Sequence, residues 1–193
     1  MRDEAIALHA QAAAATVVDD TVTLFAGTRV PELRLRHVYV RIDGGALLHH
    51  EYNDREGHAL AAGGLDRLAT IGLPAGEHRL RVEIIARHVE DKPGEARVRQ
   101  RLDLAIVKPP GAWRAGIEVL DLGLTGKAEV ALHEWSPLAT PADDDPDVRA
   151  VAYLAQAGRP LEARIRLGQL QVHSPGFGIP ERVRLALNAA EGA

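Results

Sequence analysis

The stretch EHRLRVEIIARH, residues 77–88, alternates apolar and charged side chains along most of its length. Arginine or glutamate occupies most of its odd-numbered positions. The even-numbered positions before the last are His78, Leu80, Val82, Ile84 and Ala86. Successive side chains of a β-strand point to opposite faces, so one face of this strand should pack on a core while the other meets water. Residues 77–88 therefore predict an amphipathic strand.

The next stretch, RVRQRLDLAI at residues 97–106, repeats the alternation after a turn that contains Pro93 and Gly94. Its apolar positions are Val98, Leu102, Leu104 and Ile106, and the charged positions between them are Arg97, Arg99, Arg101 and Asp103. Two amphipathic runs joined by a Pro-Gly turn are typical of a β-hairpin. This hairpin is the centre from which the rest of the fold is predicted.

Further strands are expected on both sides of the hairpin. Residues 33–43 change the phase of their apolar alternation near His37, which indicates a β-bulge or burial on both faces. The Asp-Gly-Gly turn that follows predicts a return strand at residues 46–52. Other strands are expected at residues 16–25, 65–73, 115–122 and 127–135. About seven or eight strands across residues 16–135 predict a two-layer antiparallel β-sandwich of immunoglobulin-like proportions.

The segments outside the predicted sandwich differ from it in composition and in the spacing of their apolar residues. Residues 1–15 are rich in alanine and contain neither glycine nor proline, which predicts an N-terminal helix or arm. Residues 136–146 are acidic and contain three prolines, which predicts a linker. Apolar residues then recur with helical spacing, so residues 147–193 predict a helical appendage. The expected fold is mainly β, with a C-terminal helical hairpin.

The expected helical hairpin carries a spaced set of small and large residues. The set is Gly158, Ala163, Leu167, Leu170 and Pro175. A glycine tightens the turn, an alanine lets two helices approach closely, and a proline ends the second helix. These spacings resemble those of a tetratricopeptide repeat, over about 30 residues. The resemblance implies that residues 179–190 form the first helix of an incomplete second unit.

The match to the repeat is incomplete at two positions. Asp147 stands where the family has an aromatic residue, and Val151 stands where it usually has a small one. At least three repeats are normally needed to bury such helical surfaces. The helical segment is therefore expected to lean on the sandwich, on another copy of the chain, or on further repeats.

A second resemblance lies in the β-region. Residues 38–44, VYVRIDG, end a strand in Asp-Gly, and residues 73–83, LPAGEHRLRVE, enter the next strand. Taken together, these two pieces resemble the PEGA-type surface domains of bacterial envelope proteins, although the insertion between them is longer here. The resemblance implies a small β-sandwich that serves adhesion or interaction. It also implies an extracytoplasmic bacterial protein.

The composition narrows the possible functions. The net charge of −4, from 27 acidic and 23 basic residues, provides no overall attraction for nucleic acid. The chain has no cysteine, which excludes disulfide scaffolds, thiolate metal sites and cysteine nucleophiles. No apolar run approaches the length of a transmembrane segment, and the first twenty residues lack the pattern of a signal peptide. An export signal removed before Met1 stays an open alternative.

The densest cluster of potential metal ligands lies in residues 49–58. Its candidate ligands are His49, His50, Glu51 and His58. Zinc, copper or nickel accepts imidazole and carboxylate ligands. Adjacent histidines of a strand point to opposite faces, however, and the alternative is a polar loop beside the sandwich. No metal is assigned, because the chain has no cysteine and no His-Glu-x-x-His motif. No cofactor is assigned, because neither glycine pair has the lysine or third glycine of a phosphate-binding loop.

Two sets of residues are candidates for partner binding. The first is an arginine stripe on the exposed faces of the hairpin strands, which suits acidic partners. Its members are Arg79, Arg81, Arg97, Arg99 and Arg101. The second set is Trp113 and Trp135, whose indoles could stack on a partner or anchor the core and the linker. Cross-strand ion pairing is the structural alternative for the arginines.

These features predict a non-catalytic binding or scaffolding protein, an accessory component of a bacterial cell-envelope assembly. Its expected partners are proteins, with homo-oligomers also compatible with the sequence and nucleic acid excluded. The periplasm or cell envelope is the expected location, with the cytoplasm as the alternative. A carbohydrate-binding protein or a small metal-dependent enzyme that uses the 49–58 loop is the alternative function. A serine hydrolase is not expected, because the only serines, Ser136 and Ser174, both precede proline.

Overall fold

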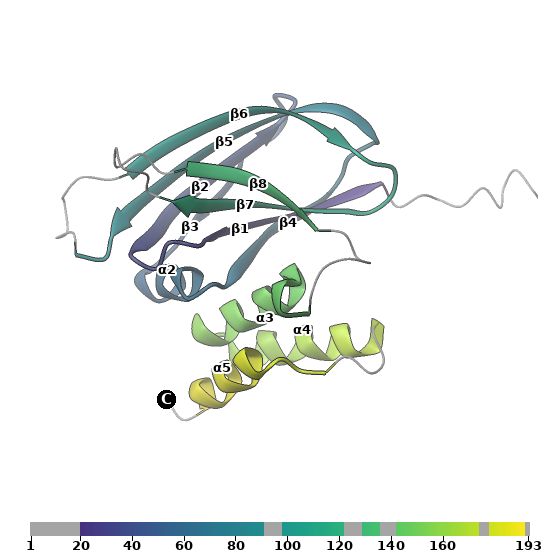
Figure 1. Cartoon of the computed structure of the whole chain (residues 1–193). Coiled ribbons are helices and arrows are strands. Elements are labelled where there is room, and N and C mark those ends of the chain that lie inside the picture. The colour runs from purple at the N-terminus through teal and green to yellow at the C-terminus, as the bar shows by residue number, and fades with distance from the viewer. Residues whose placement is uncertain (1–19, 91–97, 122–128, 136–141, 174–177, 192–193) are drawn as a thin grey trace, which may run out of the picture.

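The protein consists of two β-sheets packed face to face, with a layer of helices against one of them (Figure 1). This computed structural model describes residues 20–90, 98–121, 129–135, 142–173 and 178–191. One sheet has the order β4-β1-β7-β8 and the other has the order β3-β2-β5-β6. The predicted β-sandwich with a helical appendage is confirmed. The expected N-terminal helix or arm at residues 1–15 lies outside the described residues.

The elements follow one another along the chain with short connections. The strands are β1 (Thr21–Thr28), β2 (Leu33–Ile42), β3 (Leu48–Glu51), β4 (Leu65–Gly72), β5 (Gly76–His88), β6 (Val98–Lys108), β7 (Trp113–Asp121) and β8 (Glu129–Trp135). The helices are α2 (Asp54–Ala61), η1 (Ala142–Asp144), α3 (Pro146–Gln156), α4 (Pro160–His173) and α5 (Glu181–Glu191). No helix in the described part of the chain is long and apolar enough to cross a membrane.

The β5-β6 hairpin has the predicted alternation of apolar and charged faces. Leu80 pairs with Leu104, and Val82 pairs with Leu102, so apolar side chains face the core in matched rows. Each fully buried leucine, valine or isoleucine contributes about 1.5–3 kcal/mol relative to an exposed one. This sheet also contains the predicted bulge, since the pairing of β2 with β5 shifts register between Leu35 and His37.

One strand pairing departs from the expected antiparallel arrangement. β1 pairs with β7 in parallel, whereas the other pairings of the two sheets are antiparallel. The two strands are far apart in sequence, so the chain has room to return to the same end of the sheet between them. Their sheet is therefore mixed.

Helix α2 closes one end of the sandwich. Its N-cap is Asn53, whose side chain accepts a hydrogen bond from the Glu56 amide at 3.0 Å. The Glu56 carboxylate in turn accepts a hydrogen bond from the Asn53 amide at 2.9 Å, which completes a capping box. The helix extends for eight residues and buries Ala59 and Leu60.

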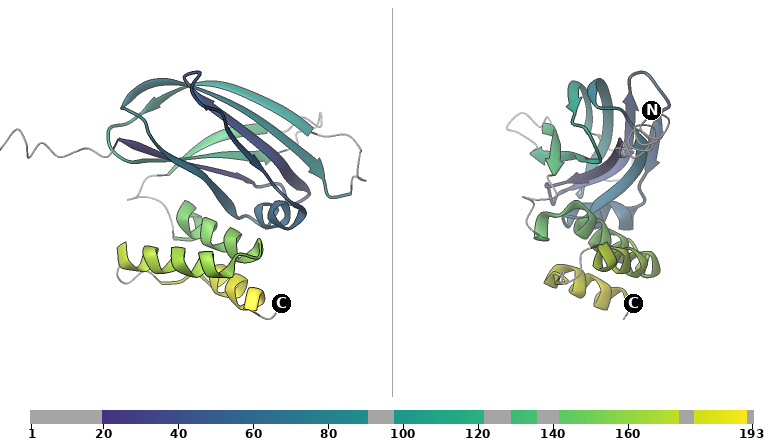
Figure 2. Two further views of the ribbon diagram at one scale, coloured as in Figure 1. Left: turned by 180° about the vertical axis from the view of Figure 1, so that it is seen from behind. Right: turned by 90° about the vertical axis from the view of Figure 1, so that its right-hand side faces the viewer.

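The helical layer contains the predicted hairpin, formed by α3 and α4, together with α5 (Figure 2). Gly158 lies in the turn between the two helices with a φ of +83°. Ala163 and Leu167 of α4 and Val183 of α5 pack against α3. In this way α3 holds both of the other helices, and it also makes the main contact with the sandwich.

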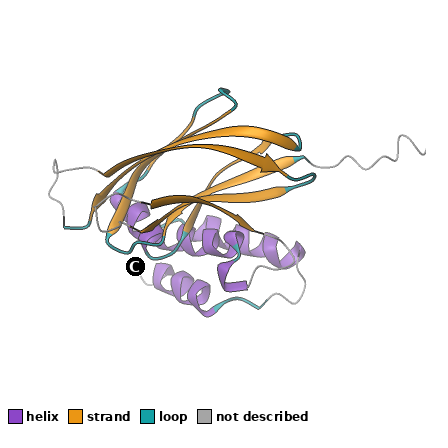
Figure 3. Cartoon of the chain, turned by 45° about the horizontal axis from the view of Figure 1, so that its top comes forward, coloured by secondary structure: helices purple, strands orange, loops and turns teal. Residues whose placement is uncertain are grey.

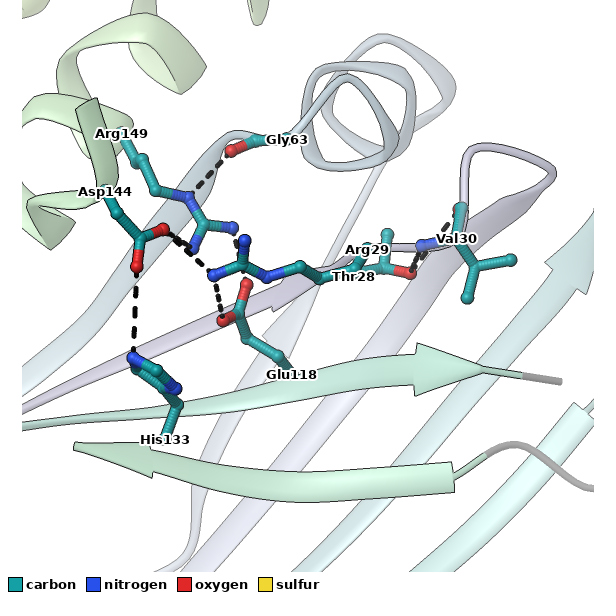
Figure 4. A network of polar contacts seen from close by, with 8 residues as sticks. All are labelled: Thr28, Arg29, Val30, Gly63, Glu118, His133, Asp144 and Arg149. Atoms are coloured by element: carbon teal, nitrogen blue, oxygen red, sulfur yellow. Dashed lines mark hydrogen bonds and ion pairs between the residues drawn. The ribbon is translucent and has the colours of Figure 1, made fainter. Parts of the chain in front are cut away.

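A buried ion pair attaches α3 to the sheet (Figure 4). Arg149 of α3 is 2% exposed, and its Nη2 donates to Oε1 of Glu118 on β7 at 2.5 Å. Glu118 is 0% exposed and also binds Arg29 through its other oxygen at 3.2 Å. The Nε of Arg149 donates to the Gly63 carbonyl at 2.9 Å. These bonds occupy most of the polar atoms of the Arg149 and Glu118 side chains. A buried ion pair is tolerated only when its remaining polar atoms are hydrogen-bonded in this way.

Asp144 of η1 joins this network at its rim. It accepts a hydrogen bond from Arg29 at 2.9 Å, and Arg149 Nη1 lies 3.4 Å away. Burial raises the pKa of the Asp144 carboxyl, but the hydrogen bond and charge of Arg29 and the charge of Arg149 outweigh it and hold that pKa below its usual range. Of the predicted linker at residues 136–146, the described part, from residue 142 onward, is thus bonded to the sandwich.

An apolar cluster completes the contact between the helical layer and the sheet. Phe25, Leu65 and Trp135 from the sheet pack together with Ala150 of α3. Gly116 lies directly under the Trp135 ring, where an added Cβ would be 2.2 Å from the indole. The outer face of the β4-β1-β7-β8 sheet is therefore covered by the helices, and none of the described helices lies over the outer face of the other sheet (Figure 3).

A histidine links the ends of β2 and β5. His78 Nδ1 lies 2.6 Å from Asp43 Oδ2, and His78 Nε2 lies 2.8 Å from the Pro74 carbonyl oxygen. Both ring nitrogens face acceptors, which favours the doubly protonated imidazolium. The hydrogen bond to Asp43 and the one to Pro74 raise the pKa of His78 above its ordinary value.

The buried ion pair generates the first prediction. Arg149→Met should lower the free energy of unfolding by about 3 kcal/mol, because it leaves the Glu118 carboxylate buried with a weaker partner. Arg149→Met combined with Glu118→Gln should recover most of this loss. Urea unfolding followed by circular dichroism measures both. Arg184→Met, which alters an exposed arginine of α5, is the matched control, and equal losses in Arg149→Met and Arg184→Met would contradict the prediction.

The second prediction concerns pH. Because the pKa of His78 is raised in the folded state, its stabilising contribution is complete below the unfolded value of about 6.5 and disappears as the pH rises through the folded pKa. The difference in unfolding free energy between the wild type and His78→Gln should therefore shrink between pH 6 and pH 8.5, as measured by urea unfolding at each pH. Asp43→Asn should remove the same pH-dependent part. A difference that is constant with pH would exclude this role for His78.

Candidate functional site

The outer face of the β3-β2-β5-β6 sheet is the largest sheet surface that the helical layer leaves uncovered (Figures 1 and 3). Alternation along β2, β5 and β6 directs charged and aromatic side chains to this face. We call the following residues the arginine face: Tyr39, Arg41, Arg79, Arg81, Glu83, Arg99, Arg101 and Asp103. Arg97, the remaining member of the predicted stripe, lies outside the described residues.

Asp103 holds two arginines of this face at once. Its Oδ1 accepts from Arg79 Nε at 2.6 Å, and its Oδ2 accepts from Arg79 Nη2 at 3.0 Å and from Arg81 Nε at 3.3 Å. The hydrogen bond from Arg79 and the charges of both arginines lower the pKa of Asp103. The carboxylate is therefore ionised at neutral pH and fixes the direction of both guanidinium groups.

Glu83 likewise holds two arginines, at the next outward-facing pair of positions along β5 and β6. Its Oε1 lies 2.9 Å from Arg99 Nε, and its Oε2 accepts from Arg101 Nε at 3.3 Å. Arg41 has no carboxylate partner among the described residues. The arginine face thus carries more positive than negative groups, on a chain whose net charge is −4.

A hollow of about 380 Å³ lies in the middle of this face. Its lining residues are Tyr39, Arg41, Leu47, Arg81, Val82, Glu83, Arg101, Leu102 and Asp103. The lining brings guanidinium groups, an aromatic ring and the half-exposed Leu47 together. Such a mixture suits the side chains and backbone of an extended chain more than an isolated ion.

Stacked aromatic rings border the hollow on its β3 side. Tyr39 on β2 pairs with His49 on β3, and their rings are stacked and nearly parallel, with centroids 4.3 Å apart and an interplanar angle of 4°. His37 continues the stack, with its Nδ1 3.4 Å from His49 Nε2. The three rings form an exposed platform next to the arginines.

The predicted metal ligands do not converge. His49 belongs to the platform, while His50 points to the other side of β3, where its Nδ1 lies 3.6 Å from Asp66 Oδ2. Glu51 ends β3, and His58 lies in α2. Among the residues described in the structure, no three histidine, aspartate or glutamate side chains are close enough to hold a metal ion. Adjacent strand positions separate the two histidines, as the alternation requires.

The two tryptophans do not form a partner-binding surface. Trp113 is 6% exposed and Trp135 is 4% exposed. Trp113 belongs to the sandwich core, and Trp135 anchors the helical layer through Phe25 and Ala150. Their assignment to partner binding is wrong, and the alternative of core and helix anchoring holds. Neither indole is available for stacking on a ligand.

A smaller polar cavity of about 160 Å³ lies between β4, α3 and α4. Tyr52 donates a hydrogen bond to Asp66 Oδ2 at 3.0 Å, and burial raises the pKa of this carboxyl. Tyr153 also lines the cavity, and its buried hydroxyl has no hydrogen-bond partner among the described residues. The cluster ties the helical layer to β4. Beside the cavity, Arg159 is ion-paired with Glu162, and Arg166 is ion-paired with Asp147.

Sequence reasoning missed Tyr39, Arg41 and His37. The signal was present, since these residues occupy the alternate phase of VYVRI, opposite Val38 and Val40. Placing them beside the arginines requires knowing that β2 pairs with β5, which alternation within one strand does not reveal.

No protein-family model matches the chain, and no curated protein matches it. The resemblances to tetratricopeptide repeats and to PEGA-type domains therefore stay predictions. The functional argument rests on the geometry of the arginine face.

Proposed function

We propose that this chain is a binding module that holds an acidic segment of a partner protein on its arginine face. The observation that supports this most strongly is that two carboxylates each orient two arginines of the adjacent strand. Asp103 on β6 holds two arginines of β5, and Glu83 on β5 holds two arginines of β6, which together form an array of oriented arginines. Arginines held in fixed directions lose less side-chain freedom when they bind a second carboxylate. The array is thus preorganised for several carboxylates spaced along an extended chain.

The register of the strands sets the spacing of these contacts. Arg41 pairs with Arg81 across β2 and β5, and Arg101 pairs with Glu83 across β6 and β5, one row further along. Neighbouring strands lie about 4.8 Å apart, and alternate residues of a strand lie about 6.6 Å apart. An extended acidic peptide that crosses the hollow diagonally would meet Arg41, Arg81 and Arg101 in turn.

The proposal is for binding and not for catalysis because the charged groups of the face are shared in ion pairs and open to solvent. We further propose, from the PEGA-type resemblance, that the module is an accessory part of a bacterial cell-envelope assembly. Scaffolding by the helical layer is consistent with this role. Because the helices are docked on the sandwich, a protein bound to the helical layer would be held at a fixed distance from the arginine face.

An oligo-glutamate peptide tests the proposal. In about 50 mM salt, Arg81→Gln combined with Arg101→Gln should weaken peptide binding about tenfold, because two of the positive charges that contact the peptide are lost. Asp103→Asn should strengthen it, since this change frees Arg79 and Arg81. Fluorescence anisotropy with a labelled peptide measures each affinity. Arg159→Gln combined with Arg184→Gln removes two helical arginines as a charge-matched control, and equal weakening in both double variants would refute the site.

An acidic polysaccharide is the second candidate, because the stacked rings of Tyr39 and His49 beside the arginines offer an aromatic contact to a sugar ring as well as to a peptide. Tyr39→Ala separates the two ligands. It should weaken binding of an oligogalacturonate about tenfold if sugar stacking is used, while oligo-glutamate binding changes less than twofold. Isothermal titration with both ligands provides the comparison. If Tyr39→Ala leaves oligogalacturonate binding unchanged, the carbohydrate candidate is excluded.

A further inference from the structure

Strand β6 forms an edge of the sheet that carries the arginine face. One side of its backbone pairs with β5, and no other described strand pairs with its second side. Figure 1 shows β6 along the rim of the sandwich that lies away from the helices. A strand in this position presents a row of N–H and C=O groups that its own sheet does not use. We call this side of β6 the β6 edge.

The β6 edge lacks most of the devices that protect edge strands. β6 has 11 residues and pairs with β5 from Val98 to Lys108 without a shift of register. The other edge strands are shorter or less regular, since β3 has 4 residues and the pairings of β4 and β8 each contain a shift. Proteins also protect edges with proline or with a charge that points towards the core. Residues 98–107 contain no proline, and those that face the core carry no charge.

The core is incompletely covered beside this edge. On β5, Leu80 is 0% exposed and Val82 is 4% exposed. Their partners on β6, Leu104 and Leu102, are only half-buried. A further strand beside β6 would cover both leucines with its own core-facing side chains. Because burial of apolar surface favours association, the core-facing residues of that strand should be apolar.

Charges on the outer face of β6 decide what the other residues of that strand should be. The side chains of Arg99 and Arg101 are 59% and 71% exposed, and both contact one carboxylate, that of Glu83. Positive charge is therefore in excess at this end of the edge. Side chains of paired strands lie directly opposite each other, where opposite charges stabilise the pairing and like charges destabilise it. Acidic residues opposite the two arginines are thus favoured.

We propose that the β6 edge accepts an extended strand of the acidic partner, which joins the sheet through main-chain hydrogen bonds. The strand has acidic residues opposite Arg99 and Arg101 and apolar residues opposite Leu102 and Leu104. It runs antiparallel to β6, because antiparallel pairing is slightly more stable per residue than parallel pairing. This inference rests on the proposed function, since the path of the acidic segment across the hollow ends at Arg101, on the strand that forms the edge.

A labelled peptide of sequence VTVTVEVE tests the strand. In the antiparallel register its two glutamates lie opposite Arg101 and Arg99, and its central valines lie opposite Leu104 and Leu102. It should bind the full chain at least about tenfold more tightly than VVTTVVEE, which has the same composition without the alternation. Fluorescence anisotropy at a peptide concentration too low for self-association measures both affinities. Equal affinities of the two peptides overturn the proposal.

N-methylation of the same peptide tests the main-chain hydrogen bonds. Alternate N–H groups of an added strand point to β6, and those between them point to solvent. Methylation of every second residue in one phase should therefore weaken binding at least about tenfold, and methylation in the other phase less than about threefold. Equal effects of the two phases would show that the peptide does not pair with the edge, and the proposal would fail.

Gln100→Lys separates the edge from the arginine face. Gln100 lies on the core-facing side of β6, where it pairs with Ile84, so the substitution adds the inward charge that protects edge strands. VTVTVEVE should bind this variant at least about tenfold more weakly, because pairing would bury the new charge, while oligo-glutamate should bind as tightly as before or more tightly. Gln100→Met is the matched control and should bind both peptides like the wild type. Unchanged VTVTVEVE binding in Gln100→Lys overturns the edge, whereas a wild type that binds VTVTVEVE but not oligo-glutamate refutes only the arginine face.

Sedimentation velocity of the full chain without peptide tests whether a second copy takes the edge instead. The wild type and Gln100→Lys should sediment alike, because the arginines of two copies repel each other at this edge. A wild type that dimerises, together with a Gln100→Lys variant that stays monomeric, would assign the β6 edge to a second copy and overturn the proposal.

Discussion

The arrangement of the molecule depends on the ion pair between Arg149 and Glu118. A charge buried without a partner costs several kcal/mol, so each of these residues makes burial of the other tolerable. The pair is also directional, because the Arg149 guanidinium must meet Glu118 on β7 and the Gly63 carbonyl at the same time. Apolar packing of Ala150 and Trp135 attracts α3 to the sheet, and the ion pair fixes where it sits.

This attachment decides which surfaces remain free. With α3 on the β4-β1-β7-β8 sheet, the arginines on the outer face of the other sheet are open to solvent. The arginines there are supported by Asp103 and Glu83, which repeat across β5 and β6 in the same register as the buried Leu80 and Val82 rows. The same alternation therefore builds the core on one side of the sheet and the arginine face on the other.

Features that depend on local periodicity could be predicted from the sequence. Features that depend on how the helical layer packs on the sheet could not. Alternation in β5 and β6 predicted their hairpin, and Gly158 marked the helical turn. Glu118 occupies the outward phase of β7 and reads as a solvated residue, because its burial is caused by a helix that begins 28 residues later. The parallel pairing of β1 with β7 is likewise a relation between distant segments. For the same reason the sequence left open whether Trp135 binds a partner or anchors the core and the linker.

The placement of charge distinguishes the two sheets of the sandwich. Arg79 and Arg99 on the free sheet are held by carboxylates and stay open to solvent, whereas Arg149 is buried by its contact with Glu118 on the other sheet. Arginines on the free sheet repel another copy of the same sheet, which limits edge and face association of the sandwich. The proposed acidic partner would therefore meet the free sheet, and not the sheet that Arg149 ties to the helices.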